Sequence, residues 1–269
     1  MQLAFLIQHQ VCHYGRFPII EILGRRRACI YDAYRQRRFK QGTGCADRRC
    51  QPGRRAFLLV GYLRRNVLRT GNLYARFQFT ADRDYADYVY LRSDLATLSG
   101  KKFQAKRNHI NKFKKTYNYE YTPITADRIR ECLDLEAEWC KVNNCDQHEG
   151  TGNERRALIY ALHNFDALGL TGGILHVEGK IAAFTFGMPI NQDTFGVHVE
   201  KADTRIDGAY AMINYEFANH IPEQYIYINR EEDLGIEGLR KAKLSYQPAI
   251  ILEKYVACLK EQPVEAIKW

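Results

Sequence analysis

Residues 171–200 read TGGILHVEGKIAAFTFGMPINQDTFGVHVE, and the rest of the chain is organised around them. Two turn signals, Glu178-Gly179 and residues 191–193, divide it into three segments of β-strand character. The first and third segments alternate apolar and polar residues, and the middle one is almost wholly apolar. The pattern predicts an antiparallel meander of three strands, the last of which ends at Glu200.

The residues after the meander predict a change from antiparallel to parallel pairing. Residues 208–219 carry apolar side chains at helical spacing and follow a strand end. A strand at 225–229, a short basic helix at 236–246 and a last apolar strand at 250–256 are expected next. Because a strand reached through a helix crossover is usually parallel to its predecessor, strands 194–200 and 225–229 should pair in parallel.

The chain before the meander predicts two more strands and three helices. Residues 76–80 and 87–91 alternate as strands, and helices are expected at 125–142 and 154–168. The remaining helix, at 101–115, is described separately because of its charge.

This helix places seven positive charges in 15 residues without an acidic residue. Phe103, Ile110 and Phe113 mark an apolar stripe, which predicts an amphipathic helix with a basic face. A charge run of this kind is usually a solvated surface. The alternative is a wall that binds the phosphates of a nucleic acid, a coenzyme or a lipid headgroup. Both interpretations stay open, and the candidate ligand residues are Lys102, Lys106 and Arg107.

The net charge of +9 is unevenly distributed. Residues 1–70 hold 14 Arg and 1 Lys against 3 acidic residues, whereas residues 71–269 carry a net charge of −3. One interpretation is an Arg-rich arm for nucleic acid or an anionic surface. The other, which we favour, is that residues 1–75 form an atypical segment, a degenerate or misread first lobe. Residues 76–269 then form the functional domain.

Several classes of function lack their signature in this sequence. There is no Gly-x-Ser-x-Gly, His-Glu-x-x-His or Walker A motif. His176 and His198 lie inside predicted strands and are interpreted as packed histidines, so no metal site is predicted. The longest apolar run, residues 56–63, is too short to span a bilayer, and no signal peptide pattern is present. We therefore expect no transmembrane segment and a cytoplasmic location.

A series of motifs along the chain resembles a known family. It consists of Asp87-Tyr-Val-Tyr90, Leu98 to Phe103, Lys106-Arg-Asn-His109, Cys145-Asp-Gln147, Val197 to Asp203, Gly208-Ala-Tyr210 and Asp233-Leu-Gly235 through Lys243. Together they resemble the C-terminal domain of phosphatidylglycerol lysyltransferases and its stand-alone relatives, over about residues 76–260. The resemblance implies an α+β fold, a GCN5-related N-acetyltransferase-like mixed sheet flanked by helices. It also leaves open that the domain is the second lobe of a tandem pair.

The resemblance implies transfer of an acyl or aminoacyl group from a carrier to an amine or hydroxyl acceptor. No resident cofactor is expected, since the carrier, aminoacyl-tRNA or acyl-CoA, is a co-substrate. The partners implied are tRNA, coenzyme A or an anionic lipid headgroup. Two alternatives stay open, a non-catalytic module that binds an anionic ligand and an acyl-CoA-dependent N-acyltransferase.

The loop before residues 208–219 is the candidate donor site. A helix N-terminus offers N–H groups and a positive dipole end to phosphates. The loop resembles the pyrophosphate loop of acetyltransferases, whose Arg/Gln-x-x-Gly-x-Gly/Ala pattern is met at Arg205 and Gly208. Tyr210 breaks the pattern, and a large side chain there counts against acetyl-CoA. Ala209 completes the candidate site.

Acyl transfer also needs a base, and carboxylates are placed to supply one. Glu200 ends a strand beside the donor loop, while Glu232 and Asp233 follow the next parallel strand. Crowded carboxylates raise one another's pKa, which suits a base near neutrality. Salt bridges to nearby cations are an equally plausible role. The catalytic candidates are Glu200, Glu232 and Asp233, and further substrate ligands are Asp146, Arg240, Lys241 and Lys243.

Overall fold

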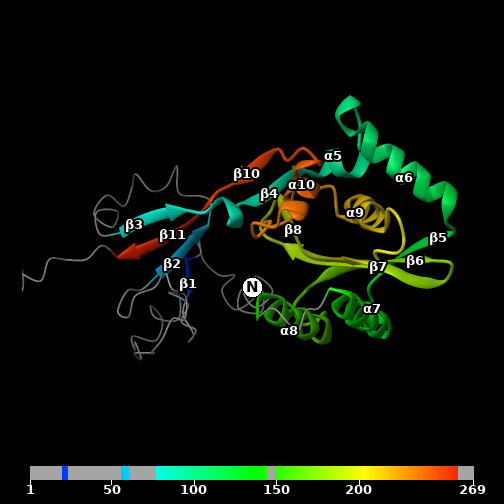
Figure 1. The fold of residues 1–269 in the computed structure, drawn as a ribbon, viewed down its shortest axis with the longest axis horizontal. Coiled ribbons are helices and arrows are strands. Elements are labelled where there is room, and N and C mark those ends of the chain that lie inside the picture. The colour runs from blue at the N-terminus through cyan, green and yellow to red at the C-terminus, as the bar shows by residue number, and fades with distance from the viewer. Residues whose placement is uncertain (1–19, 24–55, 61–76, 144–148, 260–269) are drawn as a thin grey trace, which may run out of the picture. The chain divides into compact units, whose positions relative to one another are not determined.

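The computed structural model describes residues 20–23, 56–60, 77–143 and 149–259, which are coloured in Figure 1. Asp146 and the motif around it lie outside these residues. The described chain forms two compact units, one made of Tyr88–Ile251 and the other of the segments before and after it.

The second unit contains a four-stranded sheet of order β1-β2-β11-β3. Its strands are β1 (Ile20–Leu23), β2 (Ala56–Val60), β3 (Phe77–Ala81) and β11 (Lys254–Leu259). β11 pairs antiparallel with both β2 and β3. The described parts of the Arg-rich segment therefore contribute two strands to this sheet, while the origin of residues 1–75 stays a prediction.

The first unit is built on a seven-stranded mixed sheet of order β10-β4-β9-β8-β7-β6-β5 (Figure 1). Its strands are β4 (Asp87–Leu91), β5 (Tyr119–Pro123), β6 (Thr171–Val177), β7 (Lys180–Pro189), β8 (Thr194–Ala202), β9 (Tyr227–Asn229) and β10 (Ile250–Leu252). The meander β6-β7-β8 is antiparallel, as predicted. β8 and β9 are parallel, with Thr194 opposite Tyr227, so the predicted change of pairing is confirmed.

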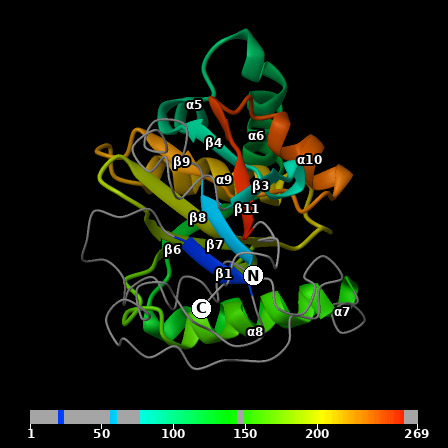
Figure 2. The ribbon, with the colours of Figure 1, turned by 90° about the vertical axis from the view of Figure 1, so that its left-hand side faces the viewer.

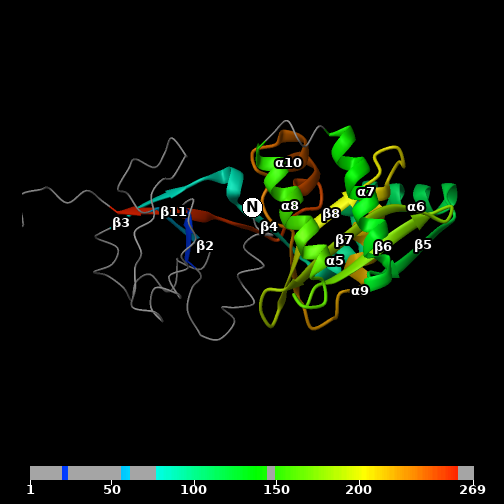
Figure 3. The same ribbon diagram turned by 90° about the horizontal axis from the view of Figure 1, so that it is seen from below.

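Helices cover both faces of this sheet (Figures 2 and 3). One face packs against α5 (Arg92–Thr97), α6 (Gln104–Thr116) and α9 (Ala209–His220). The other packs against α7 (Ile129–Val142) and α8 (Glu149–His163). The short helix α10 (Glu237–Leu244) follows β9. The predicted α+β class, a mixed sheet flanked by helices, is confirmed.

The basic helix is amphipathic, as its pattern predicted. Phe103, Ile110 and Phe113 are at most 4% exposed and belong to the core that α9 shares. Burying these side chains fixes α6 beside the start of α9, which is where the candidate donor loop lies.

The prediction of a single strand at residues 250–256 is wrong. The chain divides it into β10, in the seven-stranded sheet, and β11, which pairs with β2 and β3. An apolar run cannot show by itself that its two halves pair in different sheets.

Strands β7 and β8 approach each other closely at Gly187. A Cβ on Gly187 would lie 1.8 Å from the carbonyl oxygen of Gly196 on β8. The register also shifts between Phe186 and Gly187, so that Phe186 pairs with Val199 and Gly187 with Val197. His198 is therefore the extra residue of a β-bulge.

We predict that Gly187→Ala lowers the free energy of unfolding by at least the roughly 1–3 kcal/mol typical of an overpacked interior. Thermal and urea unfolding measure this change. Gly238→Ala in α10 is the control, because a Cβ there meets nothing within 4 Å and alanine favours a helix. Equal stability of the Gly187 variant and wild type would contradict the close approach.

Candidate active site beyond the end of strand β9

β8 extends well past its parallel neighbour. β9 pairs with β8 only as far as Gly196, whereas β7 continues to pair with β8 up to Ala202. Glu200 therefore lies on β8 beyond the last residue paired with β9. Ligands of open sheets tend to bind where neighbouring parallel strands end, so the side chains here define the candidate site.

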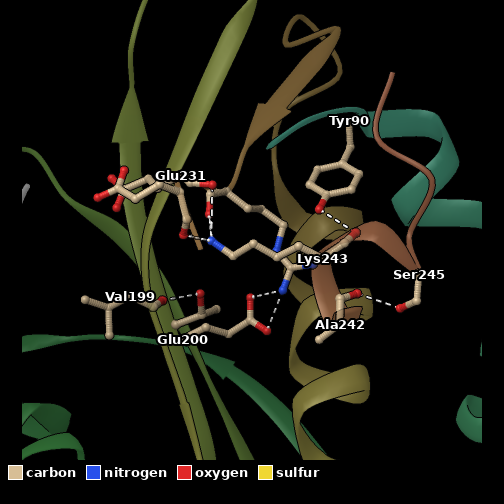
Figure 4. A network of polar contacts seen from close by, with 10 residues as sticks. Tyr90, Val199, Glu200, Glu231, Ala242, Lys243 and Ser245 are labelled. Carbon is tan, nitrogen blue, oxygen red and sulfur yellow. Dashed lines mark hydrogen bonds and ion pairs between the residues drawn. The ribbon is translucent and has the colours of Figure 1, made fainter. Parts of the chain in front are cut away.

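A buried ion pair joins β8 to the residue after β9. Arg230 Nη2 donates to both carboxylate oxygens of Glu200 at 3.0 Å, and Figure 4 shows the dashed lines that end on the Glu200 carboxylate. The guanidinium carbon also lies 5.1 Å from the ring centre of Tyr246 and 5.7 Å from that of Tyr90. Nη1 is buried and has no hydrogen bond partner among the described residues. The residue pattern does not single out Arg230, whose only signal in the sequence is its place directly after a parallel strand.

Lys243 holds the loop that follows Arg230. Its Nζ donates to the carbonyl oxygens of Arg230 at 2.6 Å, Glu231 at 3.1 Å and Glu232 at 2.5 Å (Figure 4). Tyr90 Oη donates to the Lys243 carbonyl at 2.8 Å. Burial, together with the charge of Arg230, lowers the pKa of Lys243 to about 8. The ammonium thus contacts the backbone of this loop, whereas the sequence placed it against a substrate.

Asp233 is fully buried and has several donors. Arg240 Nε and Nη2 each donate to it at 2.8 Å, and the Gly235 amide does so at 2.9 Å. The hydroxyl of Tyr88 also donates to this carboxylate. Burial favours the neutral acid, but the bonds from Arg240 and Tyr88 outweigh it and hold the pKa of Asp233 well below its usual range. The expected rise in pKa through crowding is wrong for Asp233.

His198 contacts the same loop from the bulge on β8. Its Nδ1 lies 2.5 Å from Glu231 Oε1, and the two side chains are 7% and 17% exposed. Its Nε2 is buried without a hydrogen bond partner among the described residues. The sequence showed only a histidine inside a strand, because a bulge and a loop contact leave no periodic signal.

A pocket of about 310 Å³ lies where α6 meets the start of α9. Its lining includes Lys106, His109, Gly208, Ala209 and Tyr210. A smaller cavity of about 140 Å³ shares His109, Asp207 and Gly208 with it. The structure thus brings together four of the predicted substrate ligands, Lys106, Gly208, Ala209 and Tyr210.

Lys106 connects this pocket with the buried ion pair. Its Nζ lies 4.0 Å from the ring centre of Tyr246, the ring that also faces Arg230. Burial and the charge of Arg230 both lower the pKa of Lys106. Tyr210, another residue of the pocket lining, is held by α7, because its hydroxyl accepts a hydrogen bond of 2.9 Å from Trp139 Nε1.

Other predicted ligands have partners outside the pocket lining. Lys102 pairs with Asp94 at 2.8 Å, and Arg107 Nη1 donates to the carbonyls of Leu98 and Gly100. Arg205 pairs with Asp203 at 2.7 Å. Lys241 is exposed on α10. The roles assigned to these residues from the sequence stay predictions.

No group of three or more His, Cys, Asp or Glu side chains within the described part of the chain could hold a metal ion. Over the same residues, every helix is too short or too polar to cross a bilayer.

Residues 67–258 match the sequence profile of a protein family described as phosphatidylglycerol lysyltransferase, C-terminal. The chain belongs to this phosphatidylglycerol lysyltransferase C-terminal family. The match begins nine residues before the boundary expected from the motifs. Arg230, Glu200 and the Asp233 loop all lie inside the family region.

Two solved structures are similar to this chain. A conserved protein of unknown function from Bacteroides thetaiotaomicron VPI-5482 is 82% identical, with a TM-score of 0.73, over 76% of this chain and 69% of its own. The C-terminal domain of a candidate lysylphosphatidylglycerol synthetase from Agrobacterium fabrum is 12% identical, with a TM-score of 0.53, over 77% of this chain and 81% of its own. The second likeness shows a shared fold.

An uncharacterized curated protein of Mycoplasmoides gallisepticum is 27% identical over 176 residues, which are 63% of this chain and 55% of that protein. This chain therefore matches about half the length of that relative.

The lowered pKa of Asp233 predicts how its contribution to stability depends on pH. A carboxyl whose folded pKa lies below its unfolded value of about 3.9 stabilises the fold above that value and loses this contribution as the pH falls. Asp233→Asn should therefore lower the free energy of unfolding at pH 7, and its difference from wild type should shrink below about pH 4. Urea unfolding at several pH values measures both.

Asp207→Asn is the matched control for this series. Asp207 also has a cationic partner, Lys112 at 2.6 Å, but both side chains are exposed to solvent. An exposed pair contributes little because water screens it, so this variant should stay close to wild type at every pH. A pH-independent effect of Asp233→Asn would contradict the charge assignment.

Proposed function

We propose that the chain transfers an acyl or aminoacyl group from a carrier, aminoacyl-tRNA, to an amine or hydroxyl acceptor. The observation that carries this proposal is the pocket beside the start of α9, which adjoins a buried Arg230–Glu200 pair through Lys106 and Tyr246. A lysine at the pocket suits a phosphate-containing carrier, and a buried guanidinium suits the charge that develops on a carbonyl oxygen. Membership of the family supports the same class of reaction.

The carrier's phosphates would lie between α6 and the first turn of α9. Lys106 and His109 supply side chains from α6. We expected the Gly208 and Ala209 amides to face the phosphates, but the Ala209 amide donates to the Ile206 carbonyl at 3.2 Å. The amides of Tyr210 and Ala211 come next, and a helix start leaves such groups without a partner inside the helix.

Arg230 and Glu200 would act together on the scissile carbonyl. Glu200 fixes the guanidinium through Nη2, which leaves Nη1 as a donor without a partner among the described residues. A fixed, buried donor stabilises an oxyanion strongly because little reorganisation is needed in the transition state. Asp233 would hold Arg240, and Glu232 would contribute through its carbonyl contact with Lys243.

A second candidate function is a non-catalytic module that binds an anionic ligand. It is favoured by the ion pairs themselves, since an arginine donates to both carboxylate oxygens of Glu200 and of Asp233. The lowered pKa of Asp233 makes that carboxylate a poor proton acceptor. An acyl-CoA-dependent transferase is the third candidate, and the Tyr210 side chain in the pocket lining counts against it.

The test uses total tRNA charged with radiolabelled amino acids, with vesicles of phosphatidylglycerol or with hydroxylamine as the acceptor. We expect label to leave tRNA and reach one acceptor. Glu200→Gln should lower kcat by about 10²–10³, the loss typical of one oxyanion donor.

Glu223→Gln is the control, because Glu223 is 94% exposed and pairs with Arg92 at 3.4 Å. Binding of tRNA without transfer would favour the non-catalytic module. Transfer from radiolabelled acetyl-CoA alone would favour the acyl-CoA enzyme. Equal turnover by Glu200→Gln and wild type would contradict the role given to the ion pair.

A further inference from the structure

His198 is placed by an irregularity in β8 that leaves room for its ring. It is the bulged residue between Val197 and Val199. A Cβ on Gly196 would lie 2.9 Å from Ile190 Cδ1 and 3.1 Å from His198 Cε1, so glycine leaves room for both side chains. Bulges often redirect one side chain next to a functional site.

The residue that contacts His198 is held in an uncommon backbone conformation. Glu231 has φ +59, which non-glycine residues seldom adopt. Its amide donates to Asn229 Oδ1 at 2.8 Å, and its carbonyl accepts from Lys243 Nζ and the Tyr88 amide, each at 3.1 Å. Such strain persists only where surrounding contacts determine it, and it concentrates at functional sites.

The contact with Glu231 decides the chemistry of the imidazole. A carboxylate accepts the Nδ1 proton, so a neutral ring keeps its lone pair on Nε2. This Nε2 is buried and has no hydrogen bond partner among the described residues. An imidazole with one nitrogen held by a carboxylate and the other available for a proton is the usual arrangement of a general base.

We propose that His198, oriented by Glu231, is the general base of the transfer. The acceptor's N–H or O–H proton passes to Nε2 as its nitrogen or oxygen bonds to the acyl carbon. The bond from that carbon to the carrier oxygen breaks, and the imidazolium returns the proton to this oxygen. Glu231 and Lys243 are positioning residues, since they act through His198. This inference rests on the proposed function for its substrate.

The chain contains a matched control histidine. His176 on β6 is similarly buried, and its Nε2 lies 2.7 Å from Glu131 on α7 while its Nδ1 has no partner among the described residues. Its carboxylate partner lies on α7 and not on the loop that follows β9. If buried histidine–carboxylate pairs only stabilise the fold, substitution of either histidine should have the same effect on kcat.

The first experiment needs no substrate. Long-range ¹H–¹⁵N spectra of the full-length protein at pH 7 to 8 report which ring nitrogens carry protons, and the His198→Gln variant assigns the signal. We expect a proton on Nδ1 and none on Nε2, and Glu231→Gln should shift this signal. A proton on Nε2 over the whole pH range would overturn the proposal and leave the proposed function standing.

The second experiment measures release of amino acids from the charged tRNA pool with hydroxylamine as the acceptor. His198→Gln should lower kcat by about 10²–10⁴, whereas His176→Gln should leave kcat close to that of wild type. Thermal unfolding of the two variants checks that their losses of stability are similar.

Equal losses of kcat in both variants, or an unchanged kcat in His198→Gln, would overturn the proposal. If wild-type protein transfers from neither carrier, the proposed function fails and the catalytic role of His198 fails with it. The ring-proton experiment distinguishes that outcome from a wrong assignment of the base.

Discussion

The candidate site depends on the hydrogen bonds that the Lys243 ammonium donates to one loop. Three successive carbonyls, those of Arg230, Glu231 and Glu232, accept hydrogen bonds from this one nitrogen. Burying a charged amine is costly, and charge-assisted hydrogen bonds offset that cost. A loop with two non-glycine residues at positive φ, Glu231 and Leu234, is thereby held in one conformation.

Fixing this loop determines where its charged side chains lie. Arg230 extends to Glu200 on β8, and Glu231 extends to His198 on the same strand. Asp233 faces Arg240 on α10. Two of these contacts join the loop to the part of β8 that β9 no longer covers. The loop therefore replaces backbone pairing by side-chain pairing at the point where the parallel strands part.

Much of this architecture could be predicted from the sequence, because periodicity and crossover rules are local. The alternation before Glu200 predicted the meander, and the helix between β8 and β9 predicted their parallel pairing. The same rules placed the candidate site beyond the ends of these strands. Contacts such as Arg230 with Glu200 could not be predicted, since they depend on the directions of side chains that lie far apart in the sequence.

The direction of the Asp233 pKa shift also depends on contacts that the sequence does not show. Neighbouring carboxylates in the sequence suggested mutual repulsion and a raised pKa. In the fold, Arg240 and Tyr88 donate hydrogen bonds to Asp233 and lower its pKa. The sequence predicts His198 to be a packed histidine, and its side chain is 7% exposed. Neither the bulge nor the unusual backbone of Glu231 can be seen in a residue pattern.

Hydrogen exchange of the loop amides in Lys243→Met, compared with wild type and with Lys241→Met, tests whether the Lys243 ammonium fixes the loop. Methionine has nearly the length of lysine but donates no hydrogen bond, and Lys241 is an exposed lysine on the same helix. We predict that amides of residues 230–235 exchange at least tenfold faster in Lys243→Met, while β6 and β7 keep their protection and Lys241→Met stays like wild type. Unchanged exchange of the loop in Lys243→Met would contradict this account.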